Sequence, residues 1–334
     1  MTGTITNGNG PIERKVQVTG GSTYTVSIPK AWANDREIGS GSPLHLYPFD
    51  DRLVVARPDA DVPIRRASIN VDAVGGEALS GWIEAAYAAG ADEVVIDSET
   101  GFDSTERRIA SESITRLVGI EISTESDHEI VARSLLDPAE ISLDATVDQL
   151  RRIALSMHEN AIRAVLGGND ESEELARHVV SRDNDADRLF ALVSRQFYRA
   201  LTDVREIDKL QTGRKVAFTR FRTARQLERI GDHAERIADI AIRQGEPPNA
   251  DLEAQFESIA TDARHVVRTA IDGETETALH RLDGVVERVE TLDRDLYEAK
   301  GDDNYLHGQV LESIRRTAEY GGNIAEVVTL AEIV

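Results

Sequence analysis

The helical periodicity of the second half of the chain is the feature that most restricts its fold. From Asp144 onward, apolar residues recur at spacings of three and four, as they do on one face of an α-helix. Glycine and proline divide this pattern into two sets of three helices, over residues 144–245 and 251–334. The dipeptide Ile237-Ala238 of the first set recurs as Ile324-Ala325 in the second. This internal repeat predicts a six-helix bundle made of two three-helix units.

Glycine and proline residues predict where the helices of each set end. The first helix stops at Gly167-Gly168, and Pro247-Pro248 separates the two sets. The five further helices are expected at Ser172–Thr202, Asp208–Arg243, Asp251–Ile271, Glu274–Lys300 and Asn304–Ile333.

A different periodicity marks the segment from Glu13 to Arg57. Apolar residues alternate there with polar ones in four short runs, which are separated by turn residues such as Gly20-Gly21 and Asp50-Asp51. This pattern predicts four short strands, and Pro29 suits the first turn of a helix after the second strand. Roughly 45 residues of this kind make too thin a core to close alone, so we expect a homodimer. Residues 1–12 read as a flexible polar tail.

Between these two regions, residues 67–140 alternate strand and helix patterns. The order strand-helix-strand-helix-strand-strand predicts a small sheet with its helices packed on one face. Overall we predict a multidomain α+β chain with domains at 13–58, 67–140, 144–245 and 251–334. The first strand of the middle domain is expected at Ala67–Val74, and its helices at Glu77–Ala89 and Ser104–Val118.

The charge of the chain is unevenly distributed. Its formal net charge is −22, yet residues 1–66 carry 8 basic and 7 acidic side chains. Such an acidic excess is typical of a halophilic protein that stays hydrated in concentrated salt. The N-terminal segment is therefore the part that a polyanion can approach. In molar salt counterion release contributes little, so DNA binding would depend on fitted contacts.

Two function classes are excluded by composition. The chain has no cysteine, which excludes disulfides, thiolate metal sites and cysteine nucleophiles. No apolar run approaches the ~20 residues that span a bilayer. We therefore expect a soluble, cytoplasmic protein without membrane insertion.

The third helix of the first set carries the motif with most chemistry. Glu228, Asp232, Glu235 and Asp239 share one stripe about 60° wide on that helix. Carboxylates so placed repel one another, and a hard cation or an oxygen-ligated iron would relieve the repulsion. The alternative is a stripe of solvated acids opposite the apolar face, as a salt-adapted protein would place them.

The N-terminal segment resembles the SpoVT-AbrB swapped-hairpin domain. The resemblance is carried by Arg14-Lys15-Val16, a glycine turn, the run Tyr24-x-Val26-x-Ile28-Pro29-Lys30 and Gly41. It implies that two chains interleave hairpins into one barrel, each chain supplying half, and that Arg14, Lys15 and Lys30 contact DNA. The alternative is a module that only dimerises the protein.

The helical half resembles the PhoU family of phosphate uptake regulators. The motif Leu227-Glu-Arg-Ile-Gly-Asp-His-Ala-x-x-Ile-Ala238 and the repeat carry this resemblance over residues 144–333. It implies a divalent metal or iron site formed by paired acidic motifs on neighbouring helices. The matching positions are Glu228 with Asp232, and Asp183 with Asp187. In the second set the expected counterparts are Arg315, Glu319, Val289 and Asp293, and the arginine argues against a second cluster.

The whole combination resembles an archaeal type of PhoU-domain regulator. The resemblance implies a phosphate-responsive, DNA-binding transcriptional regulator whose helical domain contacts the ATPase of a phosphate ABC transporter. A first alternative is an adaptor that regulates the transporter by protein contact without binding DNA. A second is a carboxylate-bridged di-iron enzyme, but that class needs Glu-x-x-His on two helices. The nearest element, Asp262-Ala-Arg-His265, has no mate, so we expect no enzyme.

Overall fold

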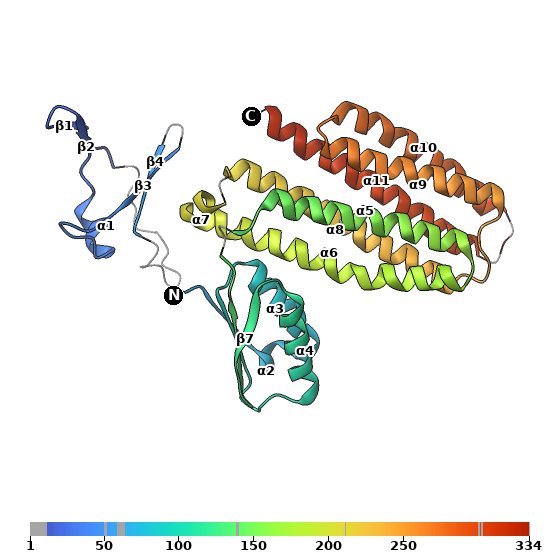
Figure 1. Cartoon of the computed structure of the whole chain (residues 1–334), viewed down its shortest axis with the longest axis horizontal. Helices are drawn as coiled ribbons and strands as arrows, with labels where there is room; N and C mark the ends of the chain where they lie inside the picture. The colour runs from blue at the N-terminus through green and yellow to red at the C-terminus, as the bar shows by residue number, and fades with distance from the viewer. Residues whose placement is uncertain are drawn as a thin grey trace. The chain divides into compact units, whose positions relative to one another are not determined.

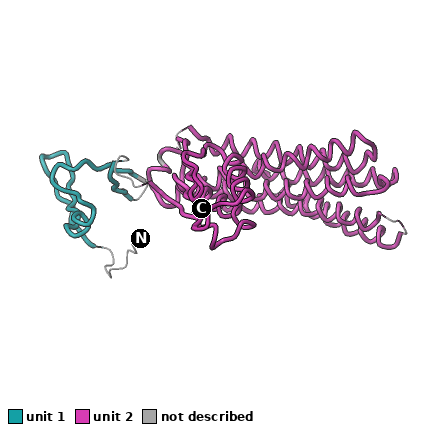
Figure 2. The backbone as a smooth tube through the Cα atoms, turned by 90° about the horizontal axis from the view of Figure 1, so that it is seen from below, with its two compact units in different colours: residues 1–62 teal, residues 63–334 magenta. Residues whose placement is uncertain are grey.

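A computed structural model describes residues 12–49, 52–58, 64–137, 140–210, 212–299, 301 and 303–333. The chain divides into two compact units, Met1–Val62 and Pro63–Val334, which are coloured separately in Figure 2. Apart from Ile12, the predicted N-terminal tail lies outside the described residues, as does the predicted turn at Asp50-Asp51.

The first unit contains two short hairpins. Strands β1 (Gln17–Thr19) and β2 (Thr23–Thr25) pair antiparallel, as do β3 (His45–Phe49) and β4 (Arg52–Ala56). Helix α1 (Lys30–Asp35) follows Pro29, where the sequence predicts a helical turn. The hairpins form separate two-stranded sheets, so the described residues of one chain make no barrel. The resemblance to the swapped-hairpin domain places Arg14, Lys15 and Val16 on the first strand, but in the structure β1 begins at Gln17 and these residues precede it.

The first unit leaves its apolar side chains uncovered. Val18 is 66% exposed, Tyr24 77% and Leu46 59%, and no described residue of this unit is buried. Apolar surface of this extent is unfavourable in water unless another surface covers it. A second copy of the unit is the cover that the sequence predicts.

The second unit begins with a small α/β domain. In the described chain, four strands form a sheet in the order β5-β6-β8-β7, where β5 and β6 are parallel and the other pairs antiparallel. Helices α3 and α4 contribute to one core with the strands, so both cover the same face, as predicted (Figure 1). The elements are β5 (Arg66–Asn70), α2 (Val71–Val74), η2 (Gly76–Ala78), α3 (Leu79–Ala88), β6 (Glu93–Asp97), α4 (Ser104–Arg116), β7 (Ile120–Glu125) and β8 (Glu129–Ser134).

The first strand of this domain ends earlier than the sequence predicts. The alternation suggested a strand through Val74, but the chain turns into α2 after Asn70. The Asn70 side chain caps that helix by accepting a hydrogen bond from the Ala73 amide. Asp72 then accepts a hydrogen bond from the Glu99 amide at 2.6 Å, which ties the turn to the end of β6.

The helical part of the second unit is a bundle with one continuous core. In the described chain it contains two sets of three long helices, as the repeat predicts (Figure 1). The sets are α5 (Leu143–Gly167), α6 (Asp170–Thr202) and α8 (Arg214–Arg243), then α9 (Ala250–Ile271), α10 (Thr275–Glu298) and α11 (Asn304–Ile333).

The third helix of the first set is interrupted, contrary to prediction. A short helix, α7 (Val204–Lys209), precedes α8, whereas the sequence suggested one helix from Asp208. Gly213 has an extended backbone (φ −83°, ψ 156°) and sits at the start of α8. Glycine is a weak helix former, so the helix is interrupted at this position, although the apolar periodicity of the sequence continues across it.

The two sets meet at equivalent positions. His233 on α8 and Tyr320 on α11 are 87 residues apart, the same offset as the repeated Ile-Ala pair, and His233 Nε2 lies 3.3 Å from the Tyr320 hydroxyl. On the neighbouring helices, His158 Nδ1 lies 3.3 Å from Nη1 of Arg264. The contact of His233 with its own counterpart, Tyr320, is the one expected where two repeats meet in a pseudo-two-fold arrangement.

Two arginines on α6 hold the α/β domain against the bundle. Arg195 is buried and donates to the backbone carbonyls of Tyr87 and Ala91, at 3.1 and 2.7 Å. Arg199 pairs with Asp92 and donates to the Gly90 carbonyl. Gly90 has φ +91°, and a Cβ there would lie 2.6 Å from Arg199 Cγ. The close approach of the domain to α6 therefore requires glycine at this position.

Candidate functional site

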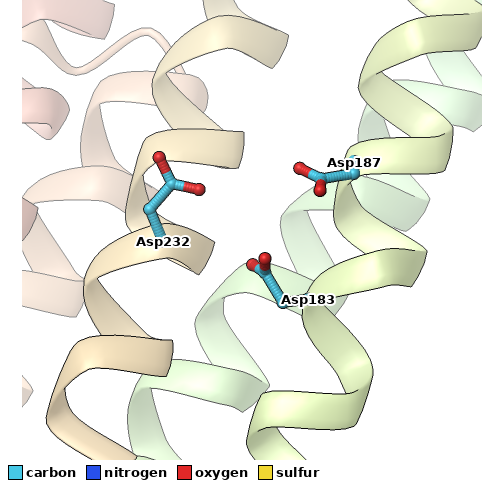
Figure 3. A group of neighbouring side chains, drawn as sticks. All are labelled: Asp183, Asp187 and Asp232. Atoms are coloured by element: carbon cyan, nitrogen blue, oxygen red, sulfur yellow. The ribbon is translucent and has the colours of Figure 1, made fainter. Parts of the chain in front are cut away.

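Three aspartates from two adjacent helices converge on one point. Asp183 and Asp187 are one turn apart on α6, and Asp232 lies opposite them on α8 (Figure 3). One carboxylate oxygen from each lies within 4.8 Å of the others. A hard cation holds oxygens at about 2.3–2.6 Å, so ligands on opposite sides of it are about 5 Å apart. The spacing therefore suits a single cation between the two helices.

The fourth predicted ligand, Glu228, lies beside this group but is held differently. It precedes Asp232 by one turn on α8, and its Oε1 accepts a hydrogen bond from Arg225 at 3.0 Å. Glu228 is only 9% exposed, so it is not one of a row of solvated acids. Of the other acids on the predicted stripe, Glu235 is half-buried and Asp239 is exposed.

A glycine of the motif lies beside the nearest aspartate. Gly231 faces α6, and a Cβ built there would lie 3.4 Å from Asp183 Oδ1 and 3.5 Å from the Ala186 methyl group. These are ordinary contact distances, so an added methyl group would fit between the two helices. The backbone of α8 therefore lies close to the carboxylates at this position, but the site does not require glycine there.

The protein environment disfavours charge on these carboxylates. Burial, together with repulsion from the neighbouring Asp187, raises the pKa of Asp183 to about 7. Burial, with repulsion from Asp232, raises the pKa of Asp187 to about 6, and the same two causes raise the pKa of Glu228 to about 7. A positive charge placed among these carboxylates would stabilise their ionised forms and lower their pKa values.

Two oxygens of the group have no partner. Asp183 Oδ1 and Glu228 Oε2 are buried and accept no hydrogen bond from the described part of the chain. A buried acceptor without a donor is costly, and a cation between the three aspartates would supply the missing partner of Asp183. The residues present therefore fit a hard, oxygen-ligated cation, with Asp183, Asp187 and Asp232 as ligands and Glu228 beside them.

The corresponding region of the second repeat has no such cluster in the described residues. Arg315 pairs with Glu312 at 2.7 Å, and Arg316 pairs with Glu319 at 2.9 Å. The expected α10 counterpart, Asp293, is displaced: it faces Gly308, eleven residues before Glu319 and about 16 Å away along α11.

The assignment of Val289 and Asp293 as counterparts of Asp183 and Asp187 is therefore wrong in register. Leu282 of α10, not Asp293, approaches α11 near Glu319, as its contact with Gly322 shows. Counting residues from a motif on one helix could not reveal how far its neighbour slides along it.

The three predicted DNA-contact residues lie in the first unit. Arg14, Lys15 and Lys30 are exposed, and Lys30 begins α1 directly after Pro29. No contact joins them to one another within the described residues. Their role therefore stays a prediction.

Sequence reasoning missed two residues that act on the cluster. Arg225 holds Glu228, although its spacing of three residues on one helix could have suggested the pair. Glu84, on α3 of the α/β domain, contributes to raising the pKa of Asp187. Nothing in the sequence relates Glu84 to Asp187, because the docking of two domains brings them near each other.

The contacts of Asp262, in the one candidate motif for a di-iron site, do not support that alternative. Asp262 on α9 pairs with Arg288 on α10 at 2.5 Å, and Arg288 also donates to the Ser258 hydroxyl. The aspartate is therefore engaged by a surface cation.

Comparisons with known proteins identify part of the helical region. Residues 147–241, which include the cluster, match the family model of the PhoU domain. No curated protein sequence matches the chain. None of the described helices is both long enough and apolar enough to cross a membrane.

Two solved structures are similar to this chain. One is the phosphate transport system regulatory protein PhoU from Streptococcus pneumoniae, at 16% identity and a TM-score of 0.46, covering 57% of this chain and 93% of that chain. The other is PhoU from Pseudomonas aeruginosa, at 17% identity and a TM-score of 0.42, covering 57% of this chain and 95% of that chain. The match to the PhoU domain model is to residues 147–241, which comprise most of the first repeat of the bundle and include the carboxylate cluster.

Proposed function

We propose that this protein is a phosphate-responsive regulator of phosphate uptake that acts by binding DNA as a homodimer. The observation that carries the proposal is the PhoU domain at residues 147–241. Its helical bundle would receive the signal, and the N-terminal unit would deliver the response. The protein is a regulator in this proposal, not an enzyme.

The N-terminal unit supports the output role through its charge and its exposed surface. Residues 1–66 carry a slight positive charge in a chain of −22. Arg14, Lys15 and Lys30 are exposed and would contact phosphates of DNA. The uncovered apolar side chains of both hairpins would be buried in a barrel shared with a second copy, which resembles the SpoVT-AbrB arrangement.

The carboxylate cluster supports the input role. Asp183, Asp187 and Asp232 would hold a divalent metal or iron, with Glu228 beside it. A bound cation would supply the positive charge that an acidic bundle lacks for binding an anion such as phosphate. The protein groups would hold the ion between α6 and α8, and Arg225 would keep Glu228 oriented toward it.

The alternative is an adaptor that contacts the ATPase of a phosphate ABC transporter and does not bind DNA. In that case the N-terminal unit would only join two bundles. The two functions differ in what the three basic residues do, so they can be separated by substitution.

The test is DNA binding by the full chain at molar salt. The probe is the region upstream of the phosphate-transporter genes, and the variant is R14Q/K15Q/K30Q. The control, R163Q/R281Q/R294Q, removes the same charge from exposed arginines of the bundle that form no ion pair with described residues. We expect a specific complex that the first variant loses and the control keeps.

If the wild-type chain, folded and dimeric, forms no specific complex, or if R14Q/K15Q/K30Q binds as tightly as the wild type, the DNA-binding role is overturned. Phosphate uptake would then be measured in cells that carry the same variants. Uptake that still responds to phosphate with R14Q/K15Q/K30Q would favour the adaptor. If both R14Q/K15Q/K30Q and the control R163Q/R281Q/R294Q abolish the response of uptake to phosphate, the result favours neither DNA binding nor the adaptor.

A further inference from the structure

A concentration of positive charge lies at the junction of α7 and α8. Residues 209–227 contain six basic side chains and no acidic one, in a chain with a formal net charge of −22. Some of these cations are neutralised within the molecule. Arg220 pairs with Asp144, and Arg225 pairs with Glu228.

Three cations of this segment are different. Arg214, Lys215 and Arg222 are exposed, and none of them forms an ion pair with a described residue, although the chain has 60 acidic residues. Arg222 instead lies over the ring of Phe218, at 5.8 Å from its centroid. Three cations on one helix without an acidic partner among the described residues make this surface positive, although the average charge of the chain predicts a negative one.

Aromatic side chains cross from α6 to α8 at the same level. Phe197 stacks on Phe221 with centroids 4.5 Å apart, and Phe218 lies 6.0 Å from Phe197. Tyr198 lies 6.0 Å from Phe221 on the outer side of this stack. Tyr198 is 44% exposed and Phe218 43%, although rings of this size are usually covered. Leu201, one helical turn after Tyr198 on α6, is also exposed.

The cations and the apolar groups share one face. Arg214, Lys215 and Arg222 lie within about 60° of Phe218 around the axis of α8. The ring contacts place Tyr198 beside this stripe, with Leu201 on the same face of α6. We call these six residues the cationic aromatic surface: Tyr198, Leu201, Arg214, Lys215, Phe218 and Arg222.

We propose that the cationic aromatic surface binds an acidic amphipathic helix of another protein. Its rings and Leu201 would take the apolar face of that helix, and its three cations would pair with the acidic side chains that flank that face. Aromatic and arginine side chains are the types that carry most binding energy at protein interfaces. Leu201 favours a protein partner over a nucleic acid, because an aliphatic side chain neither pairs with phosphate nor stacks on a base.

The surface depends on neither the metal nor the N-terminal unit. The inference deepens the proposed function by naming the chemistry of a partner, and it rests on that function in assuming that a regulator contacts another protein. Its test is binding of a peptide, measured separately from binding of promoter DNA. Either result can fail without the other.

The probe is a fluorescein-labelled peptide of about 18 residues, with leucine and phenylalanine on one helical face and glutamate elsewhere. Anisotropy is measured with the full chain at 0.15 M and 1 M salt. We expect binding that weakens with salt and that falls at least about tenfold in R214Q/K215Q/R222Q and in Y198S/F218S. The matched controls R163Q/R281Q/R294Q and L279S/Y297S change exposed residues of other helices and are expected to bind as the wild type does.

Three comparison probes decide what the surface recognises. They are a scrambled peptide of the same composition without an apolar face, a single-stranded DNA oligonucleotide, and vesicles containing phosphatidylglycerol. Weaker binding of all three supports an acidic helix as the partner. Equal binding of the scrambled peptide, or tighter binding of DNA or vesicles that R214Q/K215Q/R222Q abolishes, overturns it.

Sedimentation of the same variants measures their oligomeric state and tests whether a second copy of this chain covers the cationic aromatic surface. Unchanged oligomeric state leaves the surface free for a partner and supports the proposal. Dissociation of an oligomer by Y198S/F218S would show that a second copy of this chain covers the surface, and would overturn it. Thermal unfolding by circular dichroism confirms that each variant is folded before binding is measured.

Discussion

The two repeats of the bundle share a fold and differ at one place in their chemistry. In the first repeat, Asp183, Asp187 and Asp232 converge, and Glu228 is buried beside them. In the second, α11 carries arginine–glutamate ion pairs at the corresponding level, and the facing part of α10 is apolar. The first arrangement concentrates like charge, whereas the second neutralises it. A shared scaffold therefore does not imply a shared site.

The difference also shows which arrangement is costly without a ligand. Burial, together with repulsion between like charges, raises the pKa values of Asp183 and Glu228, and each of these carboxylates has a buried oxygen without a donor among the described residues. The partly exposed ion pairs of the second repeat neutralise their own charges, and each contributes little to stability. A fold that keeps the costly arrangement in only one of two equivalent places points to a binding role for that place.

Removing the carboxylates of the first repeat is expected to have the largest effect. The variant D183N/D187N should weaken binding of Mn²⁺ by about 100-fold or more, because it removes two of three converging ligands. The control E312Q/E319Q removes the same charge from the second repeat and should leave affinity unchanged. Isothermal titration of the full chain measures both. Equal affinities for the two variants would mean that the repeats do not differ in metal binding.

Alanine substitutions at one glycine of each repeat are expected to change the free energy of unfolding by different amounts. A Cβ at Gly321 on α11 would lie 2.9 Å from the Val267 backbone nitrogen on α9, which cannot rotate away. We expect G321A to lower the free energy of unfolding by about 1–3 kcal/mol. At Gly231 the nearest atom is a side-chain oxygen at 3.4 Å, so G231A should change stability by less than about 1 kcal/mol.

Urea unfolding at constant pH compares these two variants with the wild type. A destabilisation by G231A as large as that of G321A would contradict the idea that close helix packing requires glycine at Gly321 but not at Gly231.

The contact between the repeats predicts a pH dependence. Burial, with the Arg264 charge, lowers the pKa of His158 to about 3, against about 6.5 in the unfolded chain. The folded protein holds this histidine neutral, so its contribution is present above pH 6.5 and is lost as pH falls toward 3. By pH 5 the loss is about 2 kcal/mol.

The raised pKa values of Asp183 and Glu228 act in the opposite direction, since their protonation on acidification relieves repulsion. The measurement is therefore a difference between variants. Between pH 7.5 and pH 5, H158M should lose about 2 kcal/mol less stability than the wild type. H280Q, at an exposed histidine, should behave as the wild type. Identical pH profiles for H158M and the wild type would contradict the assigned protonation state.

The smallest effect is expected from the ion pairs of the second repeat. Arg315 is partly exposed and pairs with Glu312 and Glu319. Exposed pairs on one helix contribute about 0.3–0.5 kcal/mol, so R315Q should lower stability by less than about 1 kcal/mol. Thermal unfolding in low and high salt measures this change, which salt should reduce. A larger loss would mean that the network is structural.

Helices and strands of this chain are largely encoded in local patterns. The six long helices, the order of the α/β domain and the turn of helix after Pro29 all follow the apolar spacing and the glycine and proline positions. The exceptions have local causes that periodicity does not report. Asn70 caps a helix where the alternation continued, and Gly213 interrupts a helix whose apolar stripe runs on.

The candidate site was predictable in part. The spacing of Glu228 with Asp232 and of Asp183 with Asp187, together with the resemblance to PhoU, pointed to two helices whose acids meet. The structure shows three of these acids converging and the fourth held by Arg225. Residue spacing could not indicate which oxygen remains unsatisfied, because that depends on the distance between α6 and α8 at Gly231.

Local sequence patterns specify the type and order of the helices and strands, although not every boundary, because periods of 2 and 3.6 residues are properties of the backbone and show directly in the chain. Tertiary structure alone decided how far α10 slides along α11, which brings Leu282 and not Asp293 to the level of Glu319. It also decided that Arg195 holds a separate domain against α6. These relations depend on packing between segments far apart in the chain, and local periodicity contains no information about them.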